Sequence, residues 1–243
     1  MTARSDAWKD ETLVRTYLDG IRGAIPLAAE QIETMLRLVD AGGLPVRSFL
    51  DVGCGGGALA AALLERYPRA NATLVDFSEP MLAEARERLA PFGTQCRFLH
   101  GDLSSRDWLR DAGSQAPYDA AVSGYAIHHL TDDRKRALYG EVFDLVRPGA
   151  LFLNIEHVSS PGPWLANVFD EVMTDSLYAY QRSIGSNKTR DEVADEYVHR
   201  PDKHANILAS VESQCDWLRA LGYHDVDCYF KLFELAVFGG RKP

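Results

Sequence analysis

The segment Phe49-Leu50-Asp51-Val52-Gly53-Cys54-Gly55-Gly56-Gly57-Ala58 decides the fold of this chain. It begins as an apolar strand and runs through glycines into a helix-forming stretch that starts near residue 57. Glycines at such a turn let a ligand approach the backbone without meeting Cβ atoms, and the start of the helix aims N–H groups at that ligand. The segment therefore predicts a βα unit that binds a ligand at its turn.

Short apolar runs alternate with amphipathic stretches after this turn. Strands are predicted at 49–52, 73–76, 96–99, 120–123 and 151–155, and helices at about 57–67, 79–90 and 132–146. A helix around Trp217 and Leu221, followed by strands at 226–230 and 232–238, predicts an antiparallel hairpin at the end. The pattern indicates an α/β fold with a doubly wound, seven-stranded, mostly parallel and Rossmann-like sheet.

Two flanking regions are expected to complete a single domain over residues 1–243. Helices at about 7–20 and 26–41 predict an N-terminal helical cap over 1–45, with Pro26 in the first turn of the second helix. Residues 159–207 are rich in aromatic side chains, so we interpret them as a partly helical lid over the carboxyl edge of the sheet. Exposed aromatics also mark oligomer contacts, which leaves a homodimer interface as the alternative.

Composition excludes several classes of protein. The first 30 residues lack the pattern of a signal peptide and no apolar run approaches the length of a membrane span, so we expect a cytoplasmic protein without a membrane partner. The net charge of -9 argues against a broad nucleic-acid surface. No metal site is expected, because the four cysteines are far apart and His128, Glu156, His157 and His204 lack the close spacing of a metal motif.

The glycine turn by itself leaves two kinds of cofactor open. Gly53, Gly55 and Ala58 fit the dinucleotide spacing G-x-G-x-x-A, as in proteins that bind a nicotinamide cofactor. Asp51 lies two residues before the first glycine, where its charge would repel a diphosphate. S-adenosylmethionine has an ammonium group and a sulfonium but no phosphate, so it suits this carboxylate better. A valine at Gly53 is expected to occupy ligand space.

Two more acidic residues follow the second and third predicted strands. Asp76 is placed to accept hydrogen bonds from both ribose hydroxyls of a nucleoside. Asp102 is placed to accept one from an adenine amino group, with Phe77, Met81 and Leu103 packed on the faces of the base. For Asp102 the simpler alternative is a turn or capping residue.

These motifs together resemble the class I S-adenosylmethionine-dependent methyltransferases. Leu50-Asp51-Val52-Gly53-Cys54-Gly55 resembles the glycine motif of that family, Asp76 its ribose acid, and Gly101-Asp102-Leu103 its adenine loop. Tyr118–Ser123 is similar to the strand beside the methionine part of the cofactor, and Leu145–Gly149 to the turn before the fifth strand. The resemblance implies S-adenosyl-L-methionine as methyl donor and S-adenosyl-L-homocysteine as product.

Candidate residues for the chemistry lie near the fourth strand. Tyr125 and His128 follow that strand at the carboxyl edge, where one of them is expected to contact the acceptor, and His128 could take its proton. A packing role is the alternative for both. Tyr17 is a candidate to cover the sulfonium with its aromatic face, or a packing tyrosine.

The acceptor stays open at this stage, with a small molecule favoured over transfer RNA or a protein. The second half of the chain more loosely resembles enzymes that make or use carboxylated S-adenosylmethionine in transfer-RNA modification, and Arg200 is a candidate for their carboxylate-binding arginine. Two rival functions also stay open, a nicotinamide-dependent oxidoreductase and a protein that binds S-adenosylmethionine without catalysis.

Overall fold

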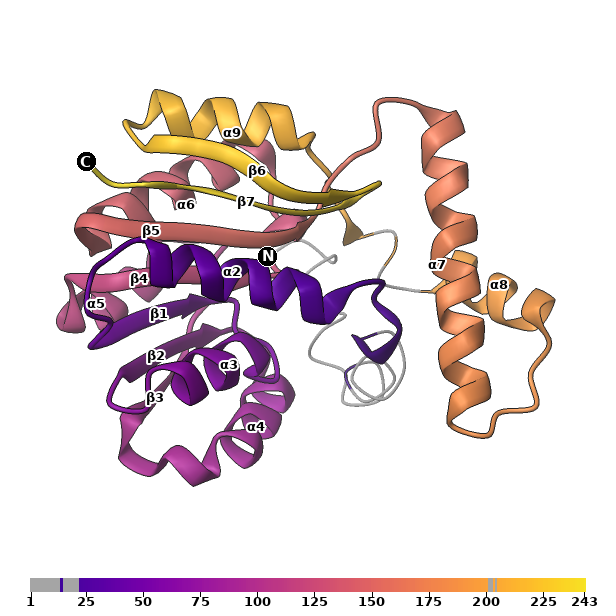
Figure 1. The fold of residues 1–243 in the computed structure, drawn as a ribbon, viewed down its shortest axis with the longest axis horizontal. Helices are drawn as coiled ribbons and strands as arrows, with labels where there is room; N and C mark the ends of the chain where they lie inside the picture. Colours follow the sequence, from indigo (N-terminus) through magenta and orange to yellow (C-terminus); the bar gives the residue numbers. More distant parts are fainter. Residues whose placement is uncertain (1–13, 15–21, 201–202, 204) are drawn as a thin grey trace.

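Alternation of apolar strands and helices produces one mixed sheet in the described part of the chain (Figure 1). The computed structural model describes residue 14 and residues 22–200, 203 and 205–243. Their strands run in the order β3-β2-β1-β4-β5-β7-β6. The strand bounds are β1 Ser48–Val52, β2 Asn71–Asp76, β3 Cys96–His100, β4 Tyr118–Gly124, β5 Val146–His157, β6 His224–Leu232 and β7 Leu235–Arg241.

The first five strands pair in parallel, whereas β7 is antiparallel to both β5 and β6. This arrangement confirms the predicted seven-stranded, doubly wound sheet with a C-terminal hairpin. The helices described are η3 Arg22–Ala24, α2 Ala28–Ala41, α3 Ala58–Arg66, α4 Glu79–Arg88, η4 Ala90–Gln95, α5 Trp108–Ala112, η5 Gly113–Gln115, η6 Ile127–His129, α6 Asp132–Leu145, α7 Pro163–Ser183, α8 Arg190–His199 and α9 Val211–Ala220.

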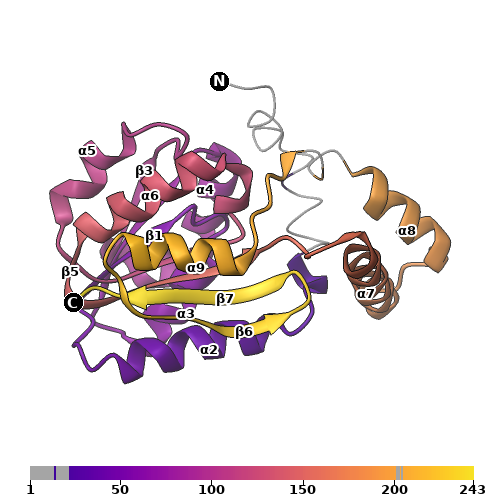
Figure 2. The same cartoon turned by 90° about the horizontal axis from the view of Figure 1, so that it is seen from above.

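Helices cover both faces of the sheet, and alternate strand residues supply the two cores. Leu50 and Val52 of β1 pack in the cluster that includes side chains of α5, α6 and α9. Phe49, the residue before Leu50, packs on the other face with side chains of α2, α3 and α4. Figure 2 shows α6 and α9 on one side of the sheet and α2 and α3 on the other. Burial on both faces explains the nearly continuous apolar character of the parallel strands.

Local capping residues set the helix starts, with one departure from expectation. Ser78 caps α4, since its hydroxyl oxygen accepts the N–H of Met81 and Pro80 lies in the first turn. Such a cap contributes about 1 kcal/mol. The helix predicted from Pro26 instead begins at Ala28, because Leu27 has a φ of 53°. Left-handed backbone at residue 27 cannot continue into a helix, so Pro26 lies before α2.

The aromatic-rich segment contains α7 and α8, which stand beyond the carboxyl ends of the parallel strands (Figure 1). Phe169, Met173 and Leu177 of α7 pack with Val193 and Tyr197 of α8. Side chains of η3 and of β7 join the same cluster, which connects the pair of helices to the domain. The helical content of the segment agrees with expectation, and its role as a lid stays a prediction. Apart from residue 14, the helix predicted at 7–20, with Tyr17, lies outside the described residues, and so does His204.

Candidate active site at the carboxyl edge of the sheet

The glycine turn between β1 and α3 bonds to the neighbouring strand β2. Gly53 and Gly55 have φ values of 69° and 51°, the left-handed region that glycine enters most readily. The N–H groups of Gly53 and Cys54 both donate to the carbonyl oxygen of Val75, at 2.8 and 3.0 Å. The Gly55 N–H donates to the Asp76 carboxylate at 2.8 Å. Because these three N–H groups bond within the protein, they are not donors to a diphosphate.

Gly53 is also the point where the turn meets the loop after β4. A Cβ atom on Gly53 would lie 2.3 Å from the Cβ of Ala126, far inside van der Waals contact. The expectation that a valine here would occupy ligand space is therefore corrected, since the side chain would first meet Ala126. A Cβ on Gly55 would have no neighbour closer than the sulfur of Met81, at 3.9 Å. The backbone at Gly55 is thus open toward one of the predicted adenine contacts.

Asp76 ends β2 with a nearly buried carboxylate that receives backbone donors. One oxygen accepts the N–H of Gly55 and the other that of Ser78, at 2.8 and 2.9 Å. Burial raises the pKa of Asp76, while these hydrogen bonds act in the opposite direction. A carboxylate offers about four lone-pair sites, so a fixed Asp76 can accept two further hydrogen bonds from ribose hydroxyls.

Asp51 and Cys54 lie on either side of Gly53 at the end of β1. Asp51 is buried, in register with Leu74 of β2 and Val122 of β4, which places it centrally in the sheet. Burial and the nearby carboxylates of Asp76 and Asp51 hold the pKa of the Cys54 thiol well above its usual range. Cys54 is therefore a neutral packing residue near neutral pH.

The predicted adenine contacts lie around the ends of β2 and β3. Met81 and Leu103 are buried and Phe77 is half-buried. Asp102 is half-buried, and its carboxylate accepts the N–H of Ser104 at 2.8 Å, which is the turn role weighed as its alternative. Close packing explains the glycine at position 101, because a Cβ there would lie 2.9 Å from the Cβ of Trp108.

Residues at the end of β4 are held mainly by the protein itself. The buried Ser123 donates its hydroxyl to the carbonyl oxygen of Val52 at 2.7 Å, which ties β4 to the start of the glycine turn. Tyr125 has a φ of 53°, in the left-handed region that residues other than glycine rarely adopt. Such backbone conformations are enriched at functional sites. Its hydroxyl donates to Gln31 of α2 at 2.5 Å.

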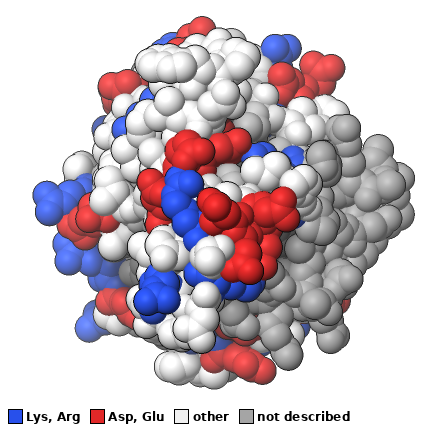
Figure 3. All heavy atoms as spheres, turned by 90° about the vertical axis from the view of Figure 1, so that its right-hand side faces the viewer, with Lys and Arg blue, Asp and Glu red and all other residues white. Residues whose placement is uncertain are grey.

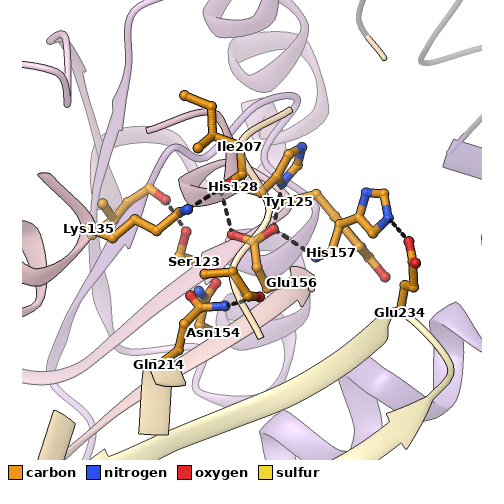
Figure 4. Close-up of polar contacts among 12 residues, drawn as sticks. Ser123, Tyr125, His128, Lys135, Asn154, Glu156, His157, Ile207, Gln214 and Glu234 are labelled. Atoms are coloured by element: carbon orange, nitrogen blue, oxygen red, sulfur yellow. Dashed lines mark hydrogen bonds and ion pairs between the residues drawn. The ribbon is translucent and has the colours of Figure 1, made fainter. Parts of the chain in front are cut away.

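His128 is joined to a carboxylate that the sequence did not single out as its partner. Its Nδ1 lies 2.6 Å from Oε1 of Glu156, at the end of β5, and its backbone N–H donates to Oε2 at 3.0 Å (Figure 4). Both side chains are almost completely buried. The two residues lie 28 positions apart and share no motif spacing, so only the pairing of β4 with β5 brings them together.

A second histidine–glutamate pair lies next to the first. Nε2 of His157 is 2.8 Å from Oε2 of Glu234, which comes from the turn between β6 and β7 (Figure 4). The ring of His157 also contacts Phe169 of α7, with centroids 5.5 Å apart. In the described part of the chain, His, Cys, Asp and Glu residues form no group of three or more suited to a metal ion.

The sequence and structure of this chain are similar to those of known proteins. Residues 49–149 match the family model described as a methyltransferase domain. An uncharacterised methyltransferase of Mycobacterium tuberculosis is 37% identical over 116 residues, which is 48% of this chain and 53% of that protein. The match thus spans about half the length of the mycobacterial relative. Residues 49–149 are thus similar to a methyltransferase domain, which supports the resemblance to the class I S-adenosylmethionine-dependent methyltransferases.

Two further comparisons extend over nearly all of this chain. A carboxy-S-adenosyl-L-methionine synthase of Wolinella succinogenes is 23% identical over 242 residues, covering 96% of this chain and 92% of that protein. The structure of an O-methyltransferase family protein from Burkholderia thailandensis aligns with a TM-score of 0.62 and 16% identity, over 98% of this chain and 62% of that one. At this identity the structural match supports the class I methyltransferase fold alone.

Proposed function

We propose that this chain transfers a methyl group from S-adenosyl-L-methionine to a small-molecule acceptor. The observation that carries the proposal is the buried carboxylate of Asp76, fixed against the glycine turn by two backbone N–H groups. A carboxylate in that position can accept hydrogen bonds from ribose hydroxyls, and the buried carboxylate of Asp51 beside the turn disfavours a diphosphate. The bonding of the turn's N–H groups to Val75 and Asp76 argues in the same direction.

The described residues at the strand ends fit the cofactor. The backbone at Gly55 is open toward Met81, which gives the nucleoside space beside the turn. We assign Asp76 to the ribose, Asp51 to the ammonium group, and Phe77, Met81, Leu103 and Asp102 to the adenine; Gly53, Cys54, Gly55, Gly101 and Ser123 shape the surrounding backbone. This assignment rests on their positions at the ends of β1, β2, β3 and β4.

The reaction needs little chemistry from the protein itself. When bound, S-adenosyl-L-methionine supplies a methyl group activated by its positively charged sulfur. The chain must hold the acceptor in line with that group and exclude water. Tyr125 and His128 lie after β4, next to β1 where the sheet order changes direction, and ligands bind at such points in open α/β sheets. We place the acceptor there.

Charges on α7 and α8 favour a small acceptor over a nucleic acid. Figure 3 shows acidic and basic side chains intermingled on the face of the molecule that carries these helices. Arg190 contacts Glu171 and Asp175, and Lys188 contacts Glu196. Cations paired in this way do not form the basic surface that phosphate backbones require. No helix in the described ranges has both the length and the apolar character to cross a bilayer.

Calorimetry and product analysis test the proposal. S-Adenosyl-L-methionine and S-adenosyl-L-homocysteine should bind to the purified chain, whereas NAD and NADP should not. A screen of hydroxylated, amine and thiol compounds should then yield S-adenosyl-L-homocysteine together with a methylated product. Binding of NAD alone would overturn the cofactor assignment. Binding without turnover across the screen would favour a non-catalytic S-adenosylmethionine-binding protein.

Synthesis of carboxylated S-adenosylmethionine is the second candidate. The specific observation in its favour is coverage, since the Wolinella enzyme aligns with 96% of this chain and the mycobacterial methyltransferase with 48%. Mass spectrometry of the nucleoside products distinguishes the two, because one reaction demethylates the cofactor and the other adds a carboxyl group to it. A cytoplasmic location and a homodimer stay predictions from the sequence.

A further inference from the structure

The loop after β3, residues 101–107, carries the carboxylate that we assign to the adenine amino group. Oδ1 of Asp102 accepts the N–H of Ser104 at 2.8 Å. Among the described residues Ser104 is the one donor to this carboxylate, which leaves Oδ2 for a ligand. The N–H of Ser105 donates to the carbonyl oxygen of Asp102 at 3.2 Å. The orientation of the carboxylate therefore depends on how the backbone of this loop is held.

The side chain of Arg134, near the start of α6, binds the backbone of this loop at two points. Its Nε donates to the carbonyl oxygen of Leu103 at 2.6 Å, and its Nη2 donates to that of Ser105 at 2.9 Å. The Leu103 carbonyl and the Ser104 N–H belong to one peptide group, and a planar trans peptide points them in opposite directions. Arg134 thus contacts one side of this peptide, and the Asp102 carboxylate contacts the other.

A buried carboxylate on the same helix fixes the guanidinium. Oε1 and Oε2 of Glu141 accept Nη1 and Nη2 of Arg134 at 2.7 and 2.6 Å, a bidentate contact. The two side chains keep 3% and 13% of their surface exposed. Oε2 of Glu141 also accepts the indole N–H of Trp108 at 3.2 Å, and Trp108 packs closely on Gly101. One buried group of side chains therefore holds both the start and the middle of the loop.

These contacts use the planar, forked shape of the Arg134 guanidinium. Four of its five N–H groups donate, two to Glu141 and one each to the carbonyl oxygens of Leu103 and Ser105. A lysine carries its donors on one nitrogen and cannot match acceptors spread around a planar group. Glu141 has a second cation nearby, since Nε of Arg106 lies 3.6 Å from its Oε1. The two loop carbonyls, and not charge balance alone, therefore account for an arginine at position 134.

We propose that Arg134 is a positioning residue that makes the cofactor site selective for a base with a free 6-amino group. This inference rests on the proposed function. With the peptide after Leu103 held by Arg134, Oδ2 of Asp102 is kept in place to accept a hydrogen bond from that amino group. A base with an oxygen at the same position presents lone pairs to the carboxylate, so the site disfavours it. Leu103 also adjoins the glycine turn, because its Cδ1 lies 3.5 Å from the Cβ position of Gly53.

Calorimetry with two nucleosides tests the role of Arg134. The ligands are S-adenosyl-L-homocysteine and S-inosyl-L-homocysteine, which has an oxygen in place of the 6-amino group. The wild-type protein should bind the adenosyl compound about tenfold more tightly, the effect of one hydrogen bond to a charged group. In Arg134→Lys this preference should fall to about twofold, because an amine can stay with Glu141 but cannot hold both loop carbonyls. The loss should come from weaker binding of the adenosyl compound.

Arg190→Lys is the matched control. Arg190, at the start of α8, also contacts two carboxylates, those of Glu171 and Asp175. Its replacement makes the same chemical change away from the loop after β3. The preference for the adenosyl compound should therefore stay at its wild-type value in this variant.

Two combined variants separate base recognition from stability. Arg134→Met together with Glu141→Met removes the pair without leaving a buried charge unpaired, and it should show the same loss of preference. Asp102→Ala should remove the preference by itself, so adding Arg134→Lys to it should change the preference no further. Thermal unfolding of each variant measures its stability independently of the two ligands.

Two results would overturn the inference and leave the proposed function intact. Equal weakening of both nucleosides in Arg134→Lys, or no weakening of either, would show that Arg134 supports the fold rather than base recognition. A wild-type protein that binds both nucleosides equally would show that Asp102 does not distinguish the bases. Absence of binding by either nucleoside would instead remove the proposed function, and this inference with it.

Discussion

Two buried carboxylates end strands of the same sheet and serve different purposes. Asp76 at the end of β2 and Glu156 at the end of β5 each accept backbone N–H groups on both oxygens. Burial raises the pKa of both. They differ in one further partner, since Glu156 also contacts the imidazole of His128, whereas the described hydrogen bonds of Asp76 come from backbone amides.

This difference separates holding a ligand from moving a proton. Backbone donors fix a carboxylate in place and favour its charged form, which suits a group that must accept hydrogen bonds from ribose hydroxyls. An imidazole partner gives the carboxylate a neighbour whose second ring nitrogen can exchange a proton with a ligand. We therefore propose that the carboxyl ends of β1, β2 and β3, called the cofactor edge, bind the cofactor. The carboxyl ends of β4 and β5, called the acceptor edge, are proposed to act on the acceptor.

The largest expected effect is at the cofactor edge. Gly53→Val should abolish measurable binding of S-adenosyl-L-methionine and lower the free energy of unfolding by about 2 to 5 kcal/mol, the sum of left-handed strain and overpacking. Its Cβ would lie 2.3 Å from that of Ala126, at a φ of 69°. Calorimetry and urea unfolding measure the two effects. Gly93→Val is the control, because Gly93 has a φ of 55° and nothing within 4 Å of its Cβ position. Equal destabilisation by both would contradict the contact with Ala126.

Asp76→Ala should weaken cofactor binding by about 1 to 3 kcal/mol, because the ribose hydroxyls lose their acceptor. The dissociation constant, measured by calorimetry, should rise by roughly 5- to 150-fold. Asp102→Ala is the matched change after β3 and should cost less, since that half-buried carboxylate already accepts the N–H of Ser104. An unchanged affinity in Asp76→Ala would take Asp76 out of the site.

At the acceptor edge the effect should depend on pH. Glu156 has a pKa of about 7, raised by burial, so lowering the pH below 7 adds a proton to the pair with His128. The base is then lost, and kcat should fall by about tenfold per pH unit on the acid side and reach a plateau above about pH 8. Initial rates between about pH 5.5 and 9, in buffers of constant ionic strength, provide the profile. A kcat that increases as the pH is lowered would contradict the proposed difference between the cofactor edge and the acceptor edge.

The smallest effect is expected at Tyr125. Tyr125→Phe removes the hydrogen bond to Gln31 and should cost about 1 kcal/mol of stability with kcat nearly unchanged. Thermal unfolding and steady-state kinetics measure these two quantities, and Tyr229→Phe serves as a control hydroxyl on β6, at the far edge of the sheet. Lost turnover at unchanged stability would instead support the chemical role that the sequence predicts for Tyr125.

The cofactor edge was more predictable than the acceptor edge for a physical reason. Asp51 and Gly53 are neighbours in sequence, and Asp76 follows the next strand, so local patterns carry most of that geometry. The partner of His128 comes from a strand 28 positions away, and the bond of Tyr125 to Gln31 spans 94 positions. No local pattern encodes such pairs. The start of α2 at residue 28 also differed, because left-handed backbone at a leucine carries no sequence signal.

The sequence alone determined the order of strands and helices, the glycine turn and the acidic residues at the strand ends, because hydrophobic periodicity and backbone conformation are local properties. Tertiary structure alone decided that β5 lies beside β4 and β7 beside β5. That arrangement buries Glu156 against His128 and Glu234 against His157. Burial and partner choice set the protonation of these groups, and both depend on residues that meet only in the folded chain.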